Sequence, residues 1–313
     1  MTAHEPASAD AVSLGSAPPV VLSGGEFEMG SARFYPEERP VHRVTVAPFA
    51  IDRFPVTNAQ FAAFVAATGY RTVAERPLDP ADYPGADPES LVPGGLVFQQ
   101  APHRIPLHDF TRWWAYVPGA NWRHPRGPDT TIVDLVDHPC VQVAYADAVA
   151  YAQWRGARLP TEAEWEFAAR GGLDQATFAW GEETDDGAPY RTNRWRGEFP
   201  WQNLRSDGFE YTSPVGSFPA NGHGLHDMTG NVWEWTSDWW RAGHCLGATS
   251  CCGPDVAARR SAAAGETIPR RVIKGGSHLC APNYCLRYRP AARQPEAVDT
   301  ATCHLGFRCV VDG

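Results

Sequence analysis

The sequence predicts a single α+β domain that is rich in loops and poor in regular secondary structure. Clear helix and strand signals occupy only short segments, whereas 29 glycines and 28 prolines are spread through the 313 residues. Glycine and proline mark turns and interrupt regular elements. Twelve tryptophans accompany them, and we expect these large rings to fill the gaps between irregular loops.

Three helices are predicted from their ends. Thr57 is followed three residues later by Gln60, and Thr161 by Glu164, which are two capping-box patterns. A glycine stands where each helical pattern stops, as expected at a helix C-terminus. These signals place helices at 57–69, at about 145–155 and at 161–171, closed by Gly69, Gly156 and Gly171.

Short strands are expected at 27–29, 41–46, 271–274 and 307–311. Between residues 18 and 313 the sequence shows no repeat and no linker, so one domain should span 18–313. The small, polar residues 1–17 are predicted to form a flexible tail. Residues 241–269 contain alanine, glycine and cysteine without periodicity, which indicates an exposed insertion.

The composition indicates which kinds of molecule the protein binds and in which cellular compartment it works. A net charge of −9 disfavours binding to a nucleic acid backbone. No stretch approaches the roughly 20 apolar residues needed to cross a membrane, and residues 1–20 lack the features of a secretory signal. We therefore expect a cytoplasmic protein in which most of the eight cysteines stay reduced.

The most suggestive segment contains two cysteines five positions apart. Cys280 and Cys285 have Ser277 and Tyr284 beside them, and the glycine pair 275–276 would allow the backbone to approach a neighbour closely. Two thiolates without a further cysteine pair suit a soft ion of low coordination, for which Cu(I) is the leading candidate. A disulfide or two unrelated buried thiols are the alternatives.

A second set of residues offers oxygen ligands. Carboxylates, an amide and backbone carbonyls in loops are what Ca²⁺ binds, although the spacing matches no EF-hand loop. Helix caps and solvated turns are the alternative. The neighbouring aromatic run 233–240 could line a groove or belong to the core. The oxygen-rich residues are Asn193, Asp207, Phe209, Asp227, Gly230, Val232 and Glu234.

Several motifs together resemble the formylglycine-generating, or sulfatase-modifying factor, enzyme family of the bacterial type. The resemblance covers the chain from about Leu22 to its C-terminus. One departure is His304, where the family more often has asparagine. The segments that carry the resemblance are 158–172 (RLPTEAEWEFAARGG), 230–235 (GNVWEW), 304–309 (HLGFRC), 119–129 (GANWRHPRGPD), 197–200 (GEFP) and the cysteine segment itself.

This resemblance implies a C-type-lectin-like variant fold and assigns roles to individual residues. Cys280 and Cys285 match a copper-binding pair, Ser277 an active-site serine, and Trp233 a tryptophan that lines the pocket. Tyr284 precedes the second thiol, as it does in the family. Two structural calcium sites are implied as well: Asn193, Arg194, Asp207 and Phe209 form the first, and Asp227, Gly230, Val232 and Glu234 form the second.

The implied activity is oxidation of a cysteine to Cα-formylglycine with O₂ as the acceptor. The cysteine would lie in a Cys-x-Pro-x-Arg motif of an unfolded or nascent sulfatase and would join Cu(I) as a third sulfur, and the enzyme would act as a monomer. Two alternatives on the same scaffold are a non-heme iron sulfoxide synthase and a non-catalytic, calcium-stabilised lectin-like binding module.

The cysteines also show departures from the family. Secreted relatives carry disulfides whose partners would fall at Ala152, Ala169 and Pro290, so Cys309 lacks a mate, which favours a reducing compartment. Three further cysteines lie in the expected insertion and match no functional position: Cys245, Cys251 and Cys252.

Overall fold

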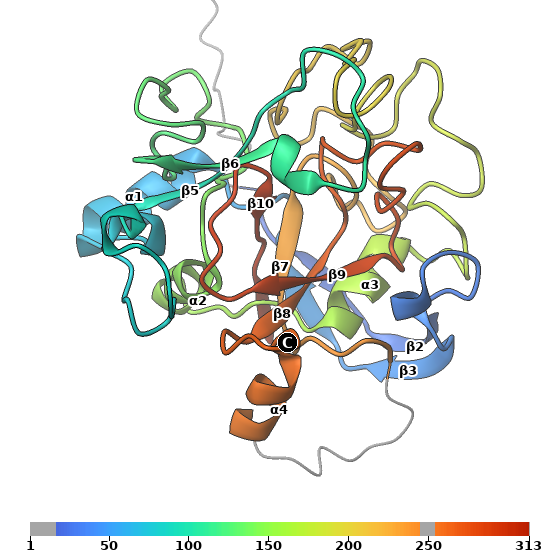
Figure 1. Cartoon of the computed structure of the whole chain (residues 1–313). Coiled ribbons are helices and arrows are strands. Elements are labelled where there is room, and N and C mark those ends of the chain that lie inside the picture. Colours follow the sequence, from blue (N-terminus) through green and yellow to red (C-terminus); the bar gives the residue numbers. More distant parts are fainter. Residues whose placement is uncertain (1–16, 245–253, 313) are drawn as a thin grey trace, which may run out of the picture.

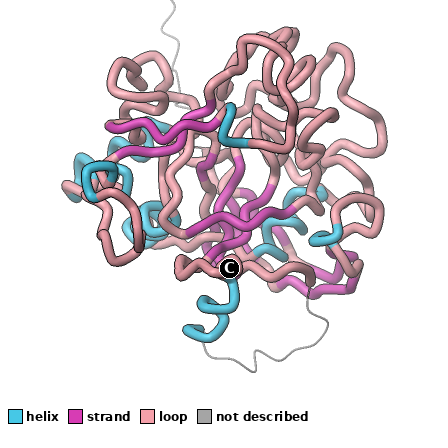
Figure 2. Tube along the Cα trace, in the orientation of Figure 1, coloured by secondary structure: helices cyan, strands magenta, loops and turns pink. Residues whose placement is uncertain are grey.

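Small sheets joined by long loops organise the chain. A computed structural model describes residues 17–244 and 254–312; the predicted tail, except for residue 17, lies outside them, as do Cys245, Cys251 and Cys252. Loops and turns make up most of the trace (Figure 2). The described helices include none that is long and apolar enough to span a bilayer. The predicted class, a loop-rich α+β domain, is confirmed.

The largest sheet has four strands in the order β10-β7-β8-β9. It lies in the middle of the molecule (Figure 1). Strands β7, β8 and β9 are antiparallel, whereas β10 pairs with β7 in parallel. The loop from β8 to β9 carries the cysteine segment, so this sheet fixes both ends of that loop. The strands are β7 (Trp233–Trp239), β8 (Arg270–Lys274), β9 (Arg293–Ala297) and β10 (Leu305–Gly306).

Three smaller sheets surround the central one. Strand β4 lies between β1 and β11, so Ile51 pairs with Val20 on one side and with Val310 on the other. Two hairpin-like pairs, β2 with β3 and β5 with β6, complete the set. Their bounds are β1 (Val20–Leu22), β2 (Gly25–Met29), β3 (His42–Val46), β4 (Phe49–Ile51), β5 (Gly94–Phe98), β6 (Trp114–Pro118) and β11 (Val310–Asp312).

The three predicted helices are confirmed, including their caps. Thr57 and Thr161 close capping boxes at the starts of α1 and α3, and Gly69 and Gly171 end these helices in the left-handed conformation. A fourth helix, α4, lies inside the segment that was expected to be an irregular insertion. The α-helices are α1 (Asn58–Thr68), α2 (Tyr145–Trp154), α3 (Glu162–Arg170) and α4 (Pro254–Ser261), and 3₁₀ turns occur at Pro36–Glu38, Val73–Glu75, Pro88–Ser90 and Phe110–Arg112.

Of the predicted strands, those at 27–29, 41–46 and 271–274 are confirmed as β2, β3 and β8. The strand predicted at 307–311 is wrong in extent, because two short strands, β10 and β11, flank residues 307–309. The backbone between them bonds to another segment: the carbonyls of Phe307 and Cys309 accept from Val56 N and Asp52 N, both at 2.9 Å. The side chain of Arg308 pairs with the buried Glu234 at 2.7 Å.

Tryptophan rings fill the core between the loops, as expected. Trp113, Trp165, Trp195, Trp233 and Trp235 are all at most 2% exposed. Buried ion pairs join the segments around these rings, so these buried charges are compensated. The pairs are Arg289–Glu38 at 2.5 Å, Arg293–Glu162 at 2.6 Å and Lys274–Glu166 at 2.9 Å.

Candidate active site

The cysteine segment begins with a tight turn that only glycines permit. Gly275 and Gly276 follow β8 directly and have φ values of +94° and +70°, a region that favours glycine. A Cβ atom at Gly276 would lie 2.8 Å from the carbonyl of Arg287. The expected close backbone approach is therefore present, and it folds the segment 275–292 back on itself.

Three backbone contacts hold this loop against the middle of the chain. The Cys280 carbonyl accepts a hydrogen bond from Trp195 N (3.1 Å), and His278 N donates to the carbonyl of Asn231 (2.9 Å). Gly230 N donates to the Gly275 carbonyl (2.9 Å). The loop is thus anchored to the two stretches, 193–209 and 227–234, that contain the predicted calcium ligands.

The two thiols meet inside the protein. Cys280 Sγ and Cys285 Sγ lie 3.3 Å apart, well beyond a disulfide bond of about 2.05 Å, and the side chains are 2% and 8% exposed. A hydrogen bond from Cys280, aided by the Arg287 guanidinium, lowers the pKa of Cys285 to about 7. Burial raises the pKa of Cys280. The Arg287 guanidinium therefore favours a thiolate at this pair.

Ser277 is positioned by both the backbone and a histidine. Its N–H donates to Cys280 Sγ (3.4 Å), and its Oγ accepts from Leu279 N (3.2 Å). Ser277 Oγ also lies 2.9 Å from Nδ1 of His304. Burial lowers the pKa of His304, so the neutral ring can accept the serine hydroxyl proton in a hydrogen bond. Sequence reasoning had noted His304 only as a departure from the family pattern.

These residues line one cavity of about 750 Å³. Trp233, the first residue of β7, forms part of the cavity wall, as predicted. The backbone N–H of Trp233 donates to the His304 carbonyl (2.9 Å). The ring of Tyr284 stacks on Phe199 with centroids 4.6 Å apart. The structure thus brings all five predicted catalytic residues together: Cys280, Cys285, Ser277, Tyr284 and Trp233.

Arg287 is a site residue that sequence reasoning missed. It lines the cavity beside Cys285 and is fixed from behind by Glu37, 2.6 Å away, and by the ring of Tyr35, 3.9 Å from its guanidinium carbon. In the sequence, the only indication of this role is that an arginine stands two positions after the second thiol. Its partners lie 250 residues away in sequence, so no local pattern could identify its role.

In the first predicted calcium set, Asn193 is buried and donates from Nδ2 to the Tyr211 carbonyl (2.9 Å). Asp207 accepts a hydrogen bond from Arg196 Nε at 3.0 Å and pairs with that guanidinium. The Asp207 charge is therefore already balanced by an arginine, and a cation here would have to share it.

The second predicted set lies in a strained loop. Asp227, Gly230 and Asn231 have positive φ values of 53°, 76° and 57°. Burial raises the pKa of Asp227, and within the described residues its carboxylate forms no ion pair, so a cation would stabilise its charge. Glu234 instead pairs with Arg308 at 2.7 Å and accepts from Trp165 Nε1 (2.8 Å). Asp227 fits a cation better than Glu234 does.

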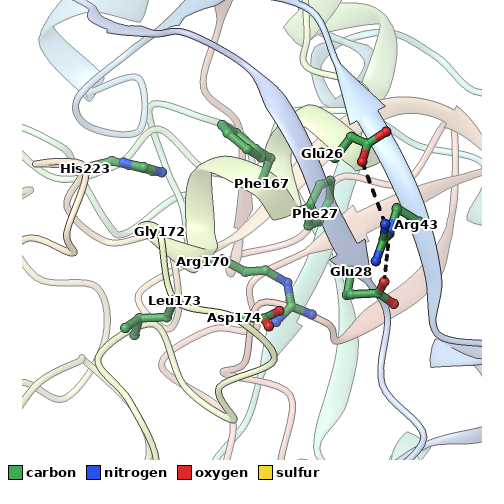
Figure 3. A pocket seen from close by; sticks show the side chains of 10 residues that line it. All are labelled: Glu26, Phe27, Glu28, Arg43, Phe167, Arg170, Gly172, Leu173, Asp174 and His223. Atoms are coloured by element: carbon green, nitrogen blue, oxygen red, sulfur yellow. Dashed lines mark hydrogen bonds and ion pairs between the residues drawn. The ribbon is translucent and has the colours of Figure 1, made fainter.

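A separate cavity of about 350 Å³ lies beside β2 and α3 and contains none of the predicted site residues. Several of its charged groups are already paired: Arg43 lies 3.2 Å from Glu28 and 3.9 Å from Glu26 (Figure 3). Arg170, which also lines it, is bound to Glu166 at 2.7 Å. The thiol-lined cavity is therefore the candidate active site.

Comparison with known proteins gives a consistent result. A family model of the sulfatase-modifying factor enzyme 1-like domain matches residues 7–313. The formylglycine-generating enzyme of Mycobacterium tuberculosis is 58% identical over 295 residues, 94% of this chain and 97% of the relative. That of Thermomonospora curvata is 46% identical over 297 residues, 94% and 93% of the two chains.

Among solved structures, PvdO from Pseudomonas aeruginosa superposes with a TM-score of 0.59 at 27% identity, covering 94% of this chain and 93% of that one. The fold, the assembled residues and these matches agree with the resemblance read from the sequence motifs. The chain belongs to the formylglycine-generating, or sulfatase-modifying factor, enzyme family.

Proposed function

We propose that this protein oxidises a cysteine side chain of a sulfatase polypeptide to Cα-formylglycine. One observation carries the proposal: Cys280 and Cys285 meet at 3.3 Å on the wall of a 750 Å³ cavity. Relatives at 58% and 46% identity are named formylglycine-generating enzymes, which supports the same reaction here.

Cys280 and Cys285 would hold copper, as Cu(I) in the working state. Both sulfurs can reach one ion, because metal–sulfur bonds are about 2.3 Å long, and thiolates favour Cu(I). The described residues contain no cluster of three or more histidine, cysteine or acidic side chains that could hold a metal, so a two-sulfur site would leave room for the substrate sulfur. Bound copper would supply the redox chemistry with O₂.

The surrounding residues bind and orient the substrate. The Arg287 guanidinium beside Cys285 favours a thiolate there. The Ser277 hydroxyl, held by His304 at 2.9 Å, offers a polar contact next to the thiols, and the indole of Trp233 excludes water from the wall. Tyr284 remains 38% exposed and lies at the cavity edge, where a peptide would enter.

We further propose that the substrate cysteine lies in a Cys-x-Pro-x-Arg segment of an unfolded or nascent sulfatase. The burial of both thiols supports this, since only an extended, flexible segment could carry a cysteine side chain into such a cavity. A proline in that segment lowers the entropy lost on binding. The enzyme would act as a monomer with O₂ as co-substrate.

Calcium is proposed as a structural ion of the two loops 193–209 and 227–234. Support comes from the buried, unpaired carboxylate of Asp227 and from the positive φ values around it. Support at Asp207 and Glu234 is weaker, because both carboxylates are paired with arginines. A cytoplasmic location is also proposed; in favour of it, the five cysteines of the described segments, Cys140, Cys280, Cys285, Cys303 and Cys309, are free.

The test is a mass measurement on a peptide that contains Cys-x-Pro-x-Arg, incubated in air with copper-loaded protein. Conversion of cysteine to formylglycine removes about 18 Da, from the chemistry of the functional group. Cys280→Ser and Cys285→Ser should each abolish the conversion and leave the melting curve nearly unchanged. Cys309→Ser is the matched control, because Cys309 is equally buried but lies outside the cavity.

Full conversion by either site variant would overturn the two-thiol proposal. A gain in peptide mass would instead favour the sulfoxide synthase, and an unchanged mass with tight peptide binding would favour the binding module. Neither alternative has a specific observation in its support.

A further inference from the structure

A second cavity opens beside the thiol cavity. It has a volume of about 460 Å³ and shares three lining residues with its neighbour, Leu96, Ala297 and Thr300. A single cysteine side chain would fill only a small part of the two volumes together. The two cavities are therefore adjacent, and the proposed reaction leaves the second one without a role.

The second cavity is mainly apolar, because its polar groups are already used. The Tyr83 hydroxyl donates to the carboxylate of Asp299, and the Tyr116 hydroxyl donates to the Val92 carbonyl at 2.6 Å. Burial raises the pKa of both phenols, so they stay protonated. A bound side chain would therefore contact the aliphatic surface of Val73, Leu78 and Ile268 and the faces of the two tyrosine rings.

The two cavities are held in a fixed relation by backbone hydrogen bonds. Leu96 of β5 donates from its N–H to the Ala301 carbonyl (2.8 Å) and accepts at its carbonyl from Cys303 N (3.1 Å). On the other wall Thr300 N donates to the Ala297 carbonyl (3.0 Å), which closes a turn at the end of β9. The walls that the two cavities share are therefore fixed by the fold.

A polar group lies beside these shared walls. Thr302 pairs with Leu96 through an isolated bridge and lines the thiol cavity. Its side chain is 2% exposed, yet its hydroxyl has no hydrogen-bond partner among the described residues. The hydroxyl itself is enclosed, so a guest polypeptide would meet this residue only as part of the wall beside Leu96.

We infer that the second cavity is a subsite for one large aliphatic or aromatic side chain of the same polypeptide whose cysteine enters the thiol cavity. The inference rests on the proposed function and extends it to substrate selection. An extended chain advances about 3.3 Å per residue with side chains on alternate sides, so a residue a few positions from the cysteine can fill the subsite while the backbone passes Thr302.

The test uses a parent peptide with alanine at every position within six of the reactive motif, and a series in which leucine replaces each alanine in turn. Wild-type protein should convert the peptide with leucine at one position with kcat/KM about tenfold above the parent, the usual range for filling an apolar pocket. Arginine or aspartate at that position should give no such gain.

Ile268→Asp and Leu78→Asp, which place a charge in this cavity only, should each remove the leucine preference. Val133→Asp is the matched control, because Val133 is 71% exposed and lines neither cavity, and it should retain the preference. The inference is overturned if no position gains more than about twofold, or if the preference survives in both cavity variants.

Conversion of the parent peptide distinguishes failure of the subsite from failure of the proposed function. If wild-type protein converts the parent but prefers no leucine peptide, the subsite fails and the proposed function stands. If nothing is converted, the proposed function fails, and the subsite is tested by fluorescence anisotropy of labelled parent and leucine peptides. Tighter binding of the leucine peptide that Ile268→Asp abolishes would support the subsite. Equal binding of the two peptides would overturn it.

Discussion

At the scale of single residues, a short chain of contacts connects the cavity wall to the thiol pair. His304 Nδ1 lies 2.9 Å from Ser277 Oγ, and Ser277 N donates to Cys280 Sγ at 3.4 Å. The serine hydroxyl accepts from Leu279 N, and the neutral imidazole can accept its proton. The imidazole thereby fixes the direction of the hydroxyl beside the sulfur that would bind the metal.

This arrangement predicts a role for His304 that can be measured. His304→Phe removes the acceptor for the Ser277 proton and should lower kcat for peptide oxidation by about 10- to 100-fold, as is common for groups that orient a metal site. His304→Asn keeps an amide acceptor and should retain most of the activity. Comparable kcat values for the wild-type and phenylalanine enzymes would show that the contact has no catalytic consequence.

The local sequence was sufficient to find the residues whose role depends on near neighbours. The thiol pair and the Gly275–Gly276 turn lie within about ten residues of each other, and the residue types alone indicate their chemical roles. Arg287 and His304 were not found as site residues, because their positions depend on Glu37 and on β10, which meet the loop only in the folded chain.

At the scale of secondary structure elements, α3 connects the N-terminal segment to the central sheet through buried charges. Glu166 binds Lys274 of β8 at 2.9 Å, binds Arg170 at 2.7 Å, and accepts from Gly30 N at 2.8 Å. Burial by itself would raise the pKa of Glu166, but Lys274 and Arg170 together lower it to about 2. The folded protein therefore holds this carboxylate in its charged form.

The lowered pKa predicts how stability depends on acid. A group whose pKa falls on folding contributes stability that is complete above its unfolded value of about 4.5 and is lost as pH falls toward 2. The urea midpoint of the wild type should therefore fall more steeply below about pH 4.5 than that of Glu166→Gln. At neutral pH this variant should be less stable by about 3 kcal/mol, because it leaves Lys274 buried with a weaker partner.

A matched control for this experiment is Glu89→Gln, at an exposed position. It should reproduce the wild-type curve in both stability and slope. If Glu166→Gln shows the same acid dependence as the wild type, the buried pair does not control it.

Elements with marked ends were predictable, and elements defined by distant partners were not. Capping boxes located α1 and α3 to the residue. Strands β5 and β9 have the sequences GGLVF and RQPEA, which lack the alternation of a half-buried strand. Their strand conformation depends on distant partners, since Ala301 and Cys303 bond to β5 and β8 pairs with β9. Such pairing is decided by tertiary contacts.

At the scale of the whole molecule, the loops proposed to bind calcium also support the thiol loop. Trp195 N holds the Cys280 carbonyl, and Gly230 N holds the Gly275 carbonyl. With few regular elements to stabilise them, such loops gain most from a bound ion, since ligand binding adds directly to the free energy of unfolding. We therefore expect calcium to affect the global stability of the protein.

Removal of calcium with a chelator should lower the melting temperature by several degrees, since an ion at about 100 times its dissociation constant adds about 2.7 kcal/mol. Asp227→Ala, which removes a ligand of one of the two proposed sites, should gain less in melting temperature from added calcium than the wild type does. Asp174→Ala, at an exposed position, should keep the wild-type response. Identical melting curves of wild-type protein in chelator and in calcium would contradict the calcium proposal.

The sheet β1-β4-β11 has a consequence for biosynthesis. Ile51 pairs with Val20, which is made before it, and with Val310, which is made much later. Because a nascent chain emerges N-terminus first, β4 keeps one open edge until β11 has emerged, and the loop with both thiols also follows β4 by a long interval. A chain that stops before β11 would leave this edge open to strand-mediated aggregation.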